Sequence, residues 1–172
     1  MSDVEAACAR LRANGEAIQA LARGLAADQA HWRPSGDAWS ITEVVNHLHD
    51  EEREDFRARL DLTLRCPGEP WPAIDPERWA RERDYNARDL GDSLAALARE
   101  RRASIEWLGA LGAGADWTAV HRHPRIGAMT AADVLAAWIA HDHLHIRQLD
   151  ELHWQWLAAR ATPIALSYAG GW

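Results

Sequence analysis

The sequence predicts an all-α fold, a four-helix bundle with long connections after the second and third helices. Four segments carry apolar residues at spacings of three and four, which is the period of one helix face. Capping boxes begin two of these segments, and no convincing strand pattern is present. We therefore expect one bundle domain over residues 1–160 and a separate C-terminal tail over residues 161–172.

The first half of the chain is predicted to hold two of the helices. A stripe of small and aliphatic residues indicates the first helix, from about Asp3 to Gln29. The capping box Ser40–Glu43 begins the second helix, which we expect to continue to about Leu64. The proline-rich connection over residues 67–86 is expected to form only one short helical turn, around residues 76–83.

The second half is predicted to hold the other two helices. The third helix is expected to begin near Asp89 or Asp92 and to end before Gly112. After another long connection, the capping box Thr130–Asp133 begins the fourth helix, which we expect to reach about Arg160. The tail has no helical pattern, so we expect it to pack over an end of the bundle or over a partner chain.

Composition excludes several classes of function. All 19 basic residues are arginine, against 26 acidic residues, so the net charge is −7 and lysine chemistry is absent. A surface of this sign does not suit nucleic acid or an anionic membrane. Cys8 and Cys66 are expected to be free thiols. Neither a signal peptide nor a long apolar run is visible, and we expect a soluble, cytoplasmic protein.

Two histidines stand where the fourth helix is expected to face the core. The predicted inward seam consists of Val134, Trp138, His141, His145, Gln148, Leu152 and Trp156. Because burying an unpartnered polar group costs about 1–3 kcal/mol, His141 and His145 need a partner, and one metal ion would satisfy both. His143 is turned about 200° from His141 and should face solvent.

A metal site needs a third ligand from another helix, and the second helix offers His47 and His49. Counting 100° per residue from Val44 places His49 slightly nearer the apolar stripe. His47, however, lies one turn before Glu51, which a heptad pattern draws inward. The residues alone leave this choice open.

Three segments resemble a known family. Trp39–Leu48 (WSITEVVNHL) is similar to the W-S-x-x-E-x-x-x-H-L entry to the second helix of the DinB-like superfamily. His123–Thr130 resembles the H-P-x-x-G-x-x-T segment before the last helix of that family, and His141–Gln148 resembles its H-D-x-x-H-x-x-Q signature. The order and lengths of the helices agree as well, so the resemblance covers about residues 1–155.

The resemblance implies a four-helix bundle, often a homodimer, with a divalent metal ion at one mouth of the bundle. By this correspondence the ligands are His47, His141 and His145, and the ion is nickel, zinc, iron or manganese. Three imidazoles leave a coordination position open for catalysis. Characterised members include S-transferases that use low-molecular-weight thiols, so we expect an enzyme that activates a thiol or water, an S-transferase or a hydrolase. The alternative is a non-catalytic module that binds a metal or a small ligand.

Two carboxylates and one amide near these ligands are candidates for supporting roles. Glu51 and Asp142 are candidates for proton transfer or for orienting a ligand imidazole, and Glu51 is our candidate catalytic residue. Gln148 lies one turn beyond His145 and can hydrogen-bond to it. Each carboxylate could equally be a solvated helix residue.

The roles of three more residues are left open by the sequence. Arg101 falls on the seam of the third helix, where it could bind a substrate carboxylate or pair with Glu51 or Asp55. His121 and His123 lie in the connection before the last helix, where they could line the mouth of the site or face solvent.

Overall fold

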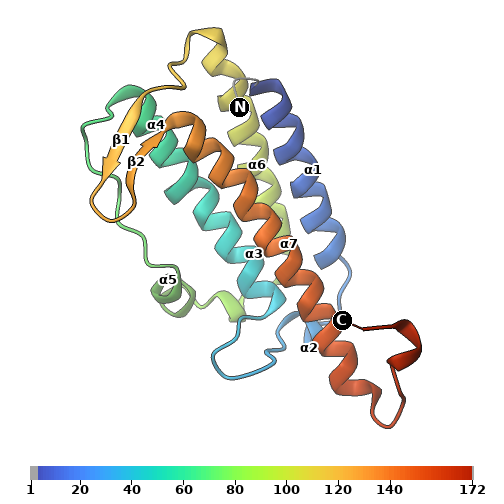
Figure 1. Cartoon of the computed structure of the whole chain (residues 1–172). Coiled ribbons are helices and arrows are strands. Elements are labelled where there is room, and N and C mark those ends of the chain that lie inside the picture. Colours follow the sequence, from blue (N-terminus) through green and yellow to red (C-terminus); the bar gives the residue numbers. More distant parts are fainter. Residues whose placement is uncertain (1–3, 172) are drawn as a thin grey trace.

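The computed structural model describes residues 4–171, which form a bundle of long helices and confirm the predicted all-α fold class (Figure 1). The second long rod of the bundle is built from α3, a π-helical turn and α4, and it packs against α6 and α7. The first rod, α1, packs against the same two helices. The first rod is α1 (Val4–Ala22), and the second joins α3 (Ile41–Asp50), the π-helical turn Glu51–Phe56 and α4 (Arg57–Arg65). The third rod is α6 (Leu90–Leu111), and the fourth is α7 (Ala131–Ala161).

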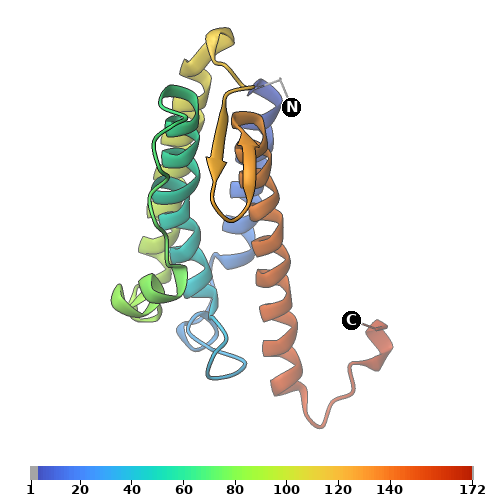
Figure 2. The same cartoon turned by 60° about the vertical axis from the view of Figure 1, so that its left-hand side comes forward.

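Shorter elements occupy the connections between the rods. They are α2 (Ala27–Ala30), α5 (Pro76–Glu82), the 3₁₀ turns Tyr85–Ala87 and Gly112–Gly114, and the strands β1 (Val120–His123) and β2 (Gly127–Thr130). A further 3₁₀ turn, Ser167–Ala169, lies in the C-terminal tail. The strands form an antiparallel hairpin that lies along α7 (Figure 2). No strand is predicted from the sequence, because four residues a side are too few to show alternation.

The capping residues set the beginnings of the helices as predicted. Ser40 and Thr130 each form a complete capping box, and Asp89 caps α6. The end of the first helix was predicted wrongly: α1 ends at Ala22 rather than near Gln29. Gly24 has a φ of 76°, the left-handed conformation that terminates helices, so the chain turns there before it forms α2.

A π-helical turn interrupts the second rod, which the sequence predicted as one continuous helix. It spans Glu51–Phe56. The wider turn changes which side chains face inward, so that Glu51, Glu52 and Asp55 are all buried. Turns of this kind are often found at functional sites. Here it places three carboxyl groups inside the bundle.

The apolar core is divided into two clusters by a polar layer. Towards one end lie Ile18, Leu48, Leu97 and Leu149, and towards the other lie Leu11, Leu60, Leu108 and Trp138. Each of the four rods contributes one buried polar residue to the layer between the two clusters. These four residues are Asn14, Glu52, Arg101 and Asp142. The middle of the bundle is therefore held by polar contacts.

Arg101 is the centre of this layer. Its Nε donates a hydrogen bond to Glu52 Oε1 at 2.9 Å, and its two terminal nitrogens bind Asp142 at 2.7 and 2.8 Å. One of them also donates to the backbone carbonyl of Leu11 at 2.7 Å. The partners expected from the sequence, Glu51 and Asp55, are not the ones that Arg101 binds. The π-helical turn brings Glu52 to the centre instead.

The C-terminal part of α7 projects beyond the other helices, and the tail turns away from the bundle (Figures 1 and 2). Ile164 is 73% exposed and Tyr168 is fully exposed. The tail therefore does not cover an end of the bundle as one of our two expectations had it, and the homodimer stays a prediction. Within residues 4–171, no helix has both the length and the apolar content needed to cross a bilayer.

Replacing Arg101 by methionine is expected to destabilise the protein by about 3–5 kcal/mol, because Glu52 and Asp142 would remain buried without their cation. Urea denaturation measures the change. Arg102→Met, one residue along on the exposed face of α6, is the matched control and should cost less than about 1 kcal/mol. Equal effects of the two substitutions would contradict the central role of Arg101.

Candidate metal centre

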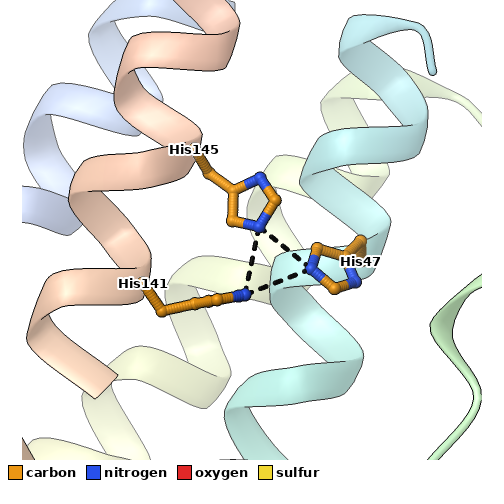
Figure 3. A group of neighbouring side chains, drawn as sticks. All are labelled: His47, His141 and His145. Carbon is orange, nitrogen blue, oxygen red and sulfur yellow. Dashed lines mark hydrogen bonds between the residues drawn. The ribbon is translucent and has the colours of Figure 1, made fainter. Parts of the chain in front are cut away.

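The candidate site lies between α3 and α7 and consists of His47, His141 and His145 (Figure 3). The capping box at Ser40 fixes where α3 begins and therefore where His47 stands two turns later. His141 and His145 are four residues apart on α7, so both rings project towards α3. Figure 3 shows the three rings meeting at their nitrogen atoms.

The three Nε2 atoms form a small triangle. His47 Nε2 lies 3.0 Å from that of His145 and 3.4 Å from that of His141, and the third side measures 3.1 Å. A neutral imidazole nitrogen carries either one hydrogen or one lone pair. Around a triangle, donors and acceptors cannot alternate, so at least one side must join two like groups. Protons alone therefore cannot satisfy this arrangement.

One cation that accepts three lone pairs satisfies the triangle. Nitrogen atoms bound at about 2.0–2.1 Å lie about 3.3 Å apart around a tetrahedral ion and about 2.9 Å apart around the adjacent positions of an octahedral one. The sides of 3.0, 3.1 and 3.4 Å include the tetrahedral value, and the two shorter ones are close to the octahedral value. The donor set is thus suited to a divalent transition metal and does not select one.

Burial keeps the three imidazoles neutral, the form that binds metal. Burial, reinforced by the neighbouring histidines, lowers the pKa of His47 to about 2. Burial and the nearby His145 lower the pKa of His141 to about 3. The pKa of His145 is lowered by burial as well, while its hydrogen bond to Gln148 acts in the opposite direction.

Gln148 sets the orientation of one ring. Its Oε1 lies 2.7 Å from His145 Nδ1, so a hydrogen on Nδ1 leaves the lone pair on Nε2 facing the triangle. His47 Nδ1 is buried without a hydrogen-bond partner. The nearest carboxylate oxygen to it is Glu51 Oε1, at 3.9 Å.

Glu51 adjoins the triangle from the π-helical turn. Its Oε2 lies 3.9 Å from His141 Nε2, and its Oε1 has no hydrogen-bond partner. Burial raises the pKa of Glu51 to about 8, and the neighbouring Asp55 acts in the same direction. Burial also raises the pKa of Asp55, against the opposing effect of Arg59. Without a metal, this carboxyl pair holds a proton at neutral pH.

The other candidates from the sequence lie elsewhere. His49 Nδ1 is 2.9 Å from Asp50 Oδ1, and His143 is exposed. Asp142 does not orient a ligand imidazole as we expected, because both of its oxygens bind Arg101. His121 is buried, but it stacks on the Trp71 ring at a centroid distance of 4.3 Å and does not reach the triangle.

The connection that holds His121 also carries His123. Its ring lies 5.7 Å from that of Trp71 by ring centroids, and it accepts backbone hydrogen bonds within the hairpin turn. His123 therefore shapes the turn of the hairpin, apart from the triangle.

Two aromatic rings that were not among the predicted site residues pack against the triangle. Trp39 lies 4.8 Å from His47 and Phe56 lies 5.0 Å from His141, by ring centroids. Trp39 directly precedes the capping residue Ser40, and an apolar residue in that position often fixes how the chain enters a helix. The position of Trp39 before the cap was therefore the feature of the sequence that could have indicated its place beside His47.

Two cavities open beside His145 and Gln148. One, of about 380 Å³, lies between α7, the loop before α3 and α5. The other, of about 580 Å³, is lined by residues of α7, including His141 and Arg147. A small molecule can therefore reach the triangle from solvent.

Glu51 should make the stability of the metal-free protein depend on pH. Its pKa is raised in the folded state, so the stabilisation is present below about pH 4.5 and is lost as pH rises towards about 8. Relative to Glu51→Gln, the wild-type free energy of unfolding should fall by on the order of 2–3 kcal/mol between pH 5 and pH 7.5. Urea denaturation of chelator-treated protein measures this, and parallel pH profiles would contradict it.

Comparisons with known proteins agree with this fold. No curated protein sequence matches the chain. A solved structure of YfiT from Bacillus subtilis, described as a probable metal-dependent hydrolase with an unusual four-helix bundle topology, superposes with a TM-score of 0.75. The identity is 21%, and the match covers 87% of this chain and 85% of that one. The model of the DinB superfamily matches residues 10–149. The chain therefore belongs to the DinB superfamily.

Proposed function

We propose that the protein is a divalent-metal-dependent hydrolase. The observation that carries the proposal is the convergence of three neutral Nε2 atoms within 3.0–3.4 Å beside a buried carboxyl group. Structural zinc sites usually have four protein ligands, whereas three histidines with an open position are typical of catalytic sites. The description of YfiT as a probable metal-dependent hydrolase supports the same class.

His47, His141 and His145 would hold the ion. When bound, it supplies Lewis acidity that lowers the pKa of a water molecule to about 7. Gln148 keeps the His145 ring in its binding tautomer through the 2.7 Å contact to Nδ1. Trp39 and Phe56 cover the rings of His47 and His141 and limit the access of solvent to them.

Glu51 would move the proton. A cation at the triangle would favour its ionised form, since an opposite charge nearby lowers a carboxyl pKa. Glu51 Oε2, 3.9 Å from His141 Nε2, can then accept a proton from the attacking water and pass it to the leaving group. The hydrogen bond between the carboxyl groups of Glu51 and Asp55 would allow the two groups to share that proton.

The sequence left activation of water and activation of a thiol as alternatives. A thiol loses its proton readily and, once it is bound as a thiolate, needs no base beside the metal. Water, in contrast, needs a general base to accept its proton as it attacks. The buried Glu51 therefore favours hydrolysis, and transfer to a low-molecular-weight thiol is the second candidate.

Tag-free protein should carry about one divalent metal ion per chain, measured by elemental analysis. His145→Ala should lose the metal, because two imidazoles bind far more weakly than three. His143→Ala, on the exposed face of the same helix, is the control and should keep it. Metal-free wild-type protein that folds normally and binds no added zinc or nickel would contradict the proposal.

Glu51→Gln should keep the metal and lose activity by about 10²–10⁴-fold, the usual contribution of a general base. The measurement is hydrolysis of a panel of small esters and amides by metal-loaded protein, with and without an added thiol. Hydrolysis that does not need the thiol is expected. Products that contain the thiol, formed equally well by Glu51→Gln, would favour the S-transferase.

A further inference from the structure

The cavity of about 380 Å³ beside His145 has an unusual charge distribution. Its size falls within the range of about 300–1,000 Å³ that is usual for small-molecule sites. Three carboxylates line it, from three different parts of the chain: Asp37 in the loop before α3, Glu77 on α5 and Glu151 on α7. No arginine lines it, and its one histidine is His145 of the triangle.

Asp37 and Glu77 differ from the other acidic groups near the site. Glu43 is bound by Arg33, and Asp55 is bound by Arg59 at 2.6 Å. Among the ion pairs of residues 4–171, none includes Asp37 or Glu77. Arg33 and Arg81 line an adjoining smaller cavity together with Asp37 and Glu77. The guanidinium of Arg33 is occupied by Glu43, and within residues 4–171 no ion pair joins Arg81 to either carboxylate. The charge of Asp37 and Glu77 is therefore available to a ligand.

An aromatic ring connects this cavity to the triangle. Trp39 lines the cavity and also packs on His47, at 4.8 Å between ring centroids. The face of an indole ring attracts cations, most strongly where solvent is limited. Glu151 is kept in place by a 2.6 Å hydrogen bond from Gln155 Nε2. A cation bound here would lie next to Trp39 and within one small molecule's length of His145.

We propose that this cavity is the specificity pocket of the site and binds a positively charged group, an ammonium or guanidinium, of the substrate. The inference rests on the proposed function, since it is the triangle that makes the neighbouring cavity a substrate pocket. The bond to be hydrolysed would then lie over the triangle, with the cationic end between Asp37, Glu77 and Trp39. Glu151 lines both cavities, but in the second it is accompanied by Arg147, so the excess of negative charge lies on the side of Asp37 and Glu77.

The test compares three probes of similar shape and different charge, which are benzylammonium, benzyl alcohol and benzoate. Their binding to metal-loaded protein is followed by ligand-observed NMR titration. Benzylammonium is expected to bind about fivefold more tightly than benzyl alcohol, as two exposed charge pairs would give, and benzoate more weakly than either. Raising the salt concentration should reduce the preference, because exposed charges are screened.

The double substitution Asp37→Asn with Glu77→Gln should remove the preference for benzylammonium and leave the metal content unchanged. The control is Glu16→Gln with Glu106→Gln, which changes the net charge equally but lies in the groove between α1 and α6. It should change the affinity for benzylammonium less than about twofold. Equal binding of all three probes, or equal effects of the two double variants, would overturn the inference.

The same titration on chelator-treated protein separates this inference from the proposed function. Asp37 and Glu77 are not among the three proposed metal ligands, so a preference for benzylammonium should persist without metal. If the chain binds no metal but keeps that preference, the hydrolase proposal fails and the cation pocket stands. If the chain binds metal and shows no preference, the pocket is wrong and the metal centre stands.

Discussion

The guanidinium of Arg101 is the interaction on which the rest of the structure depends. It binds Glu52 on the second rod, Asp142 on α7 and the backbone of α1, so a single side chain from α6 joins all four rods. Glu52 and Asp142 directly follow Glu51 and His141 in the sequence. The ion pairs therefore fix the backbone positions from which a proposed base and a proposed ligand project, although Arg101 is not one of the three ligands.

The triangle of histidines adds a second constraint. The three converging Nε2 atoms cannot satisfy one another without a metal. Beside them, His47 Nδ1 and Glu51 Oε1 are also buried without hydrogen-bond partners, which costs further free energy. The two apolar clusters and the Arg101 layer must supply the stability that holds these groups in place. Metal binding and folding are for this reason expected to be coupled. A preformed triangle also explains how the site can bind an ion with little rearrangement.

Most of the fold could be predicted from the sequence, because apolar period and capping boxes are local signals. The apolar spacing along α7 is also a local signal, so it predicted that His141 and His145 face the core. His47 could not be separated from His49 by period, because almost every residue of α3 is buried, polar as well as apolar, so the apolar stripe does not mark the boundary of the buried face. The family resemblance made the choice. The π-helical turn and the pairing of Asp142 with Arg101 depend on contacts across the bundle, which leave no local pattern.

The central claim is that His47, His141 and His145 hold one divalent metal ion and leave a position open for a small molecule. X-ray absorption at the metal edge of the reconstituted protein tests it most directly. The account predicts three imidazole nitrogen ligands, with the remaining positions filled by light atoms that an added small ligand displaces. A fourth protein ligand that no added ligand displaces, or fewer than three imidazoles, would contradict it.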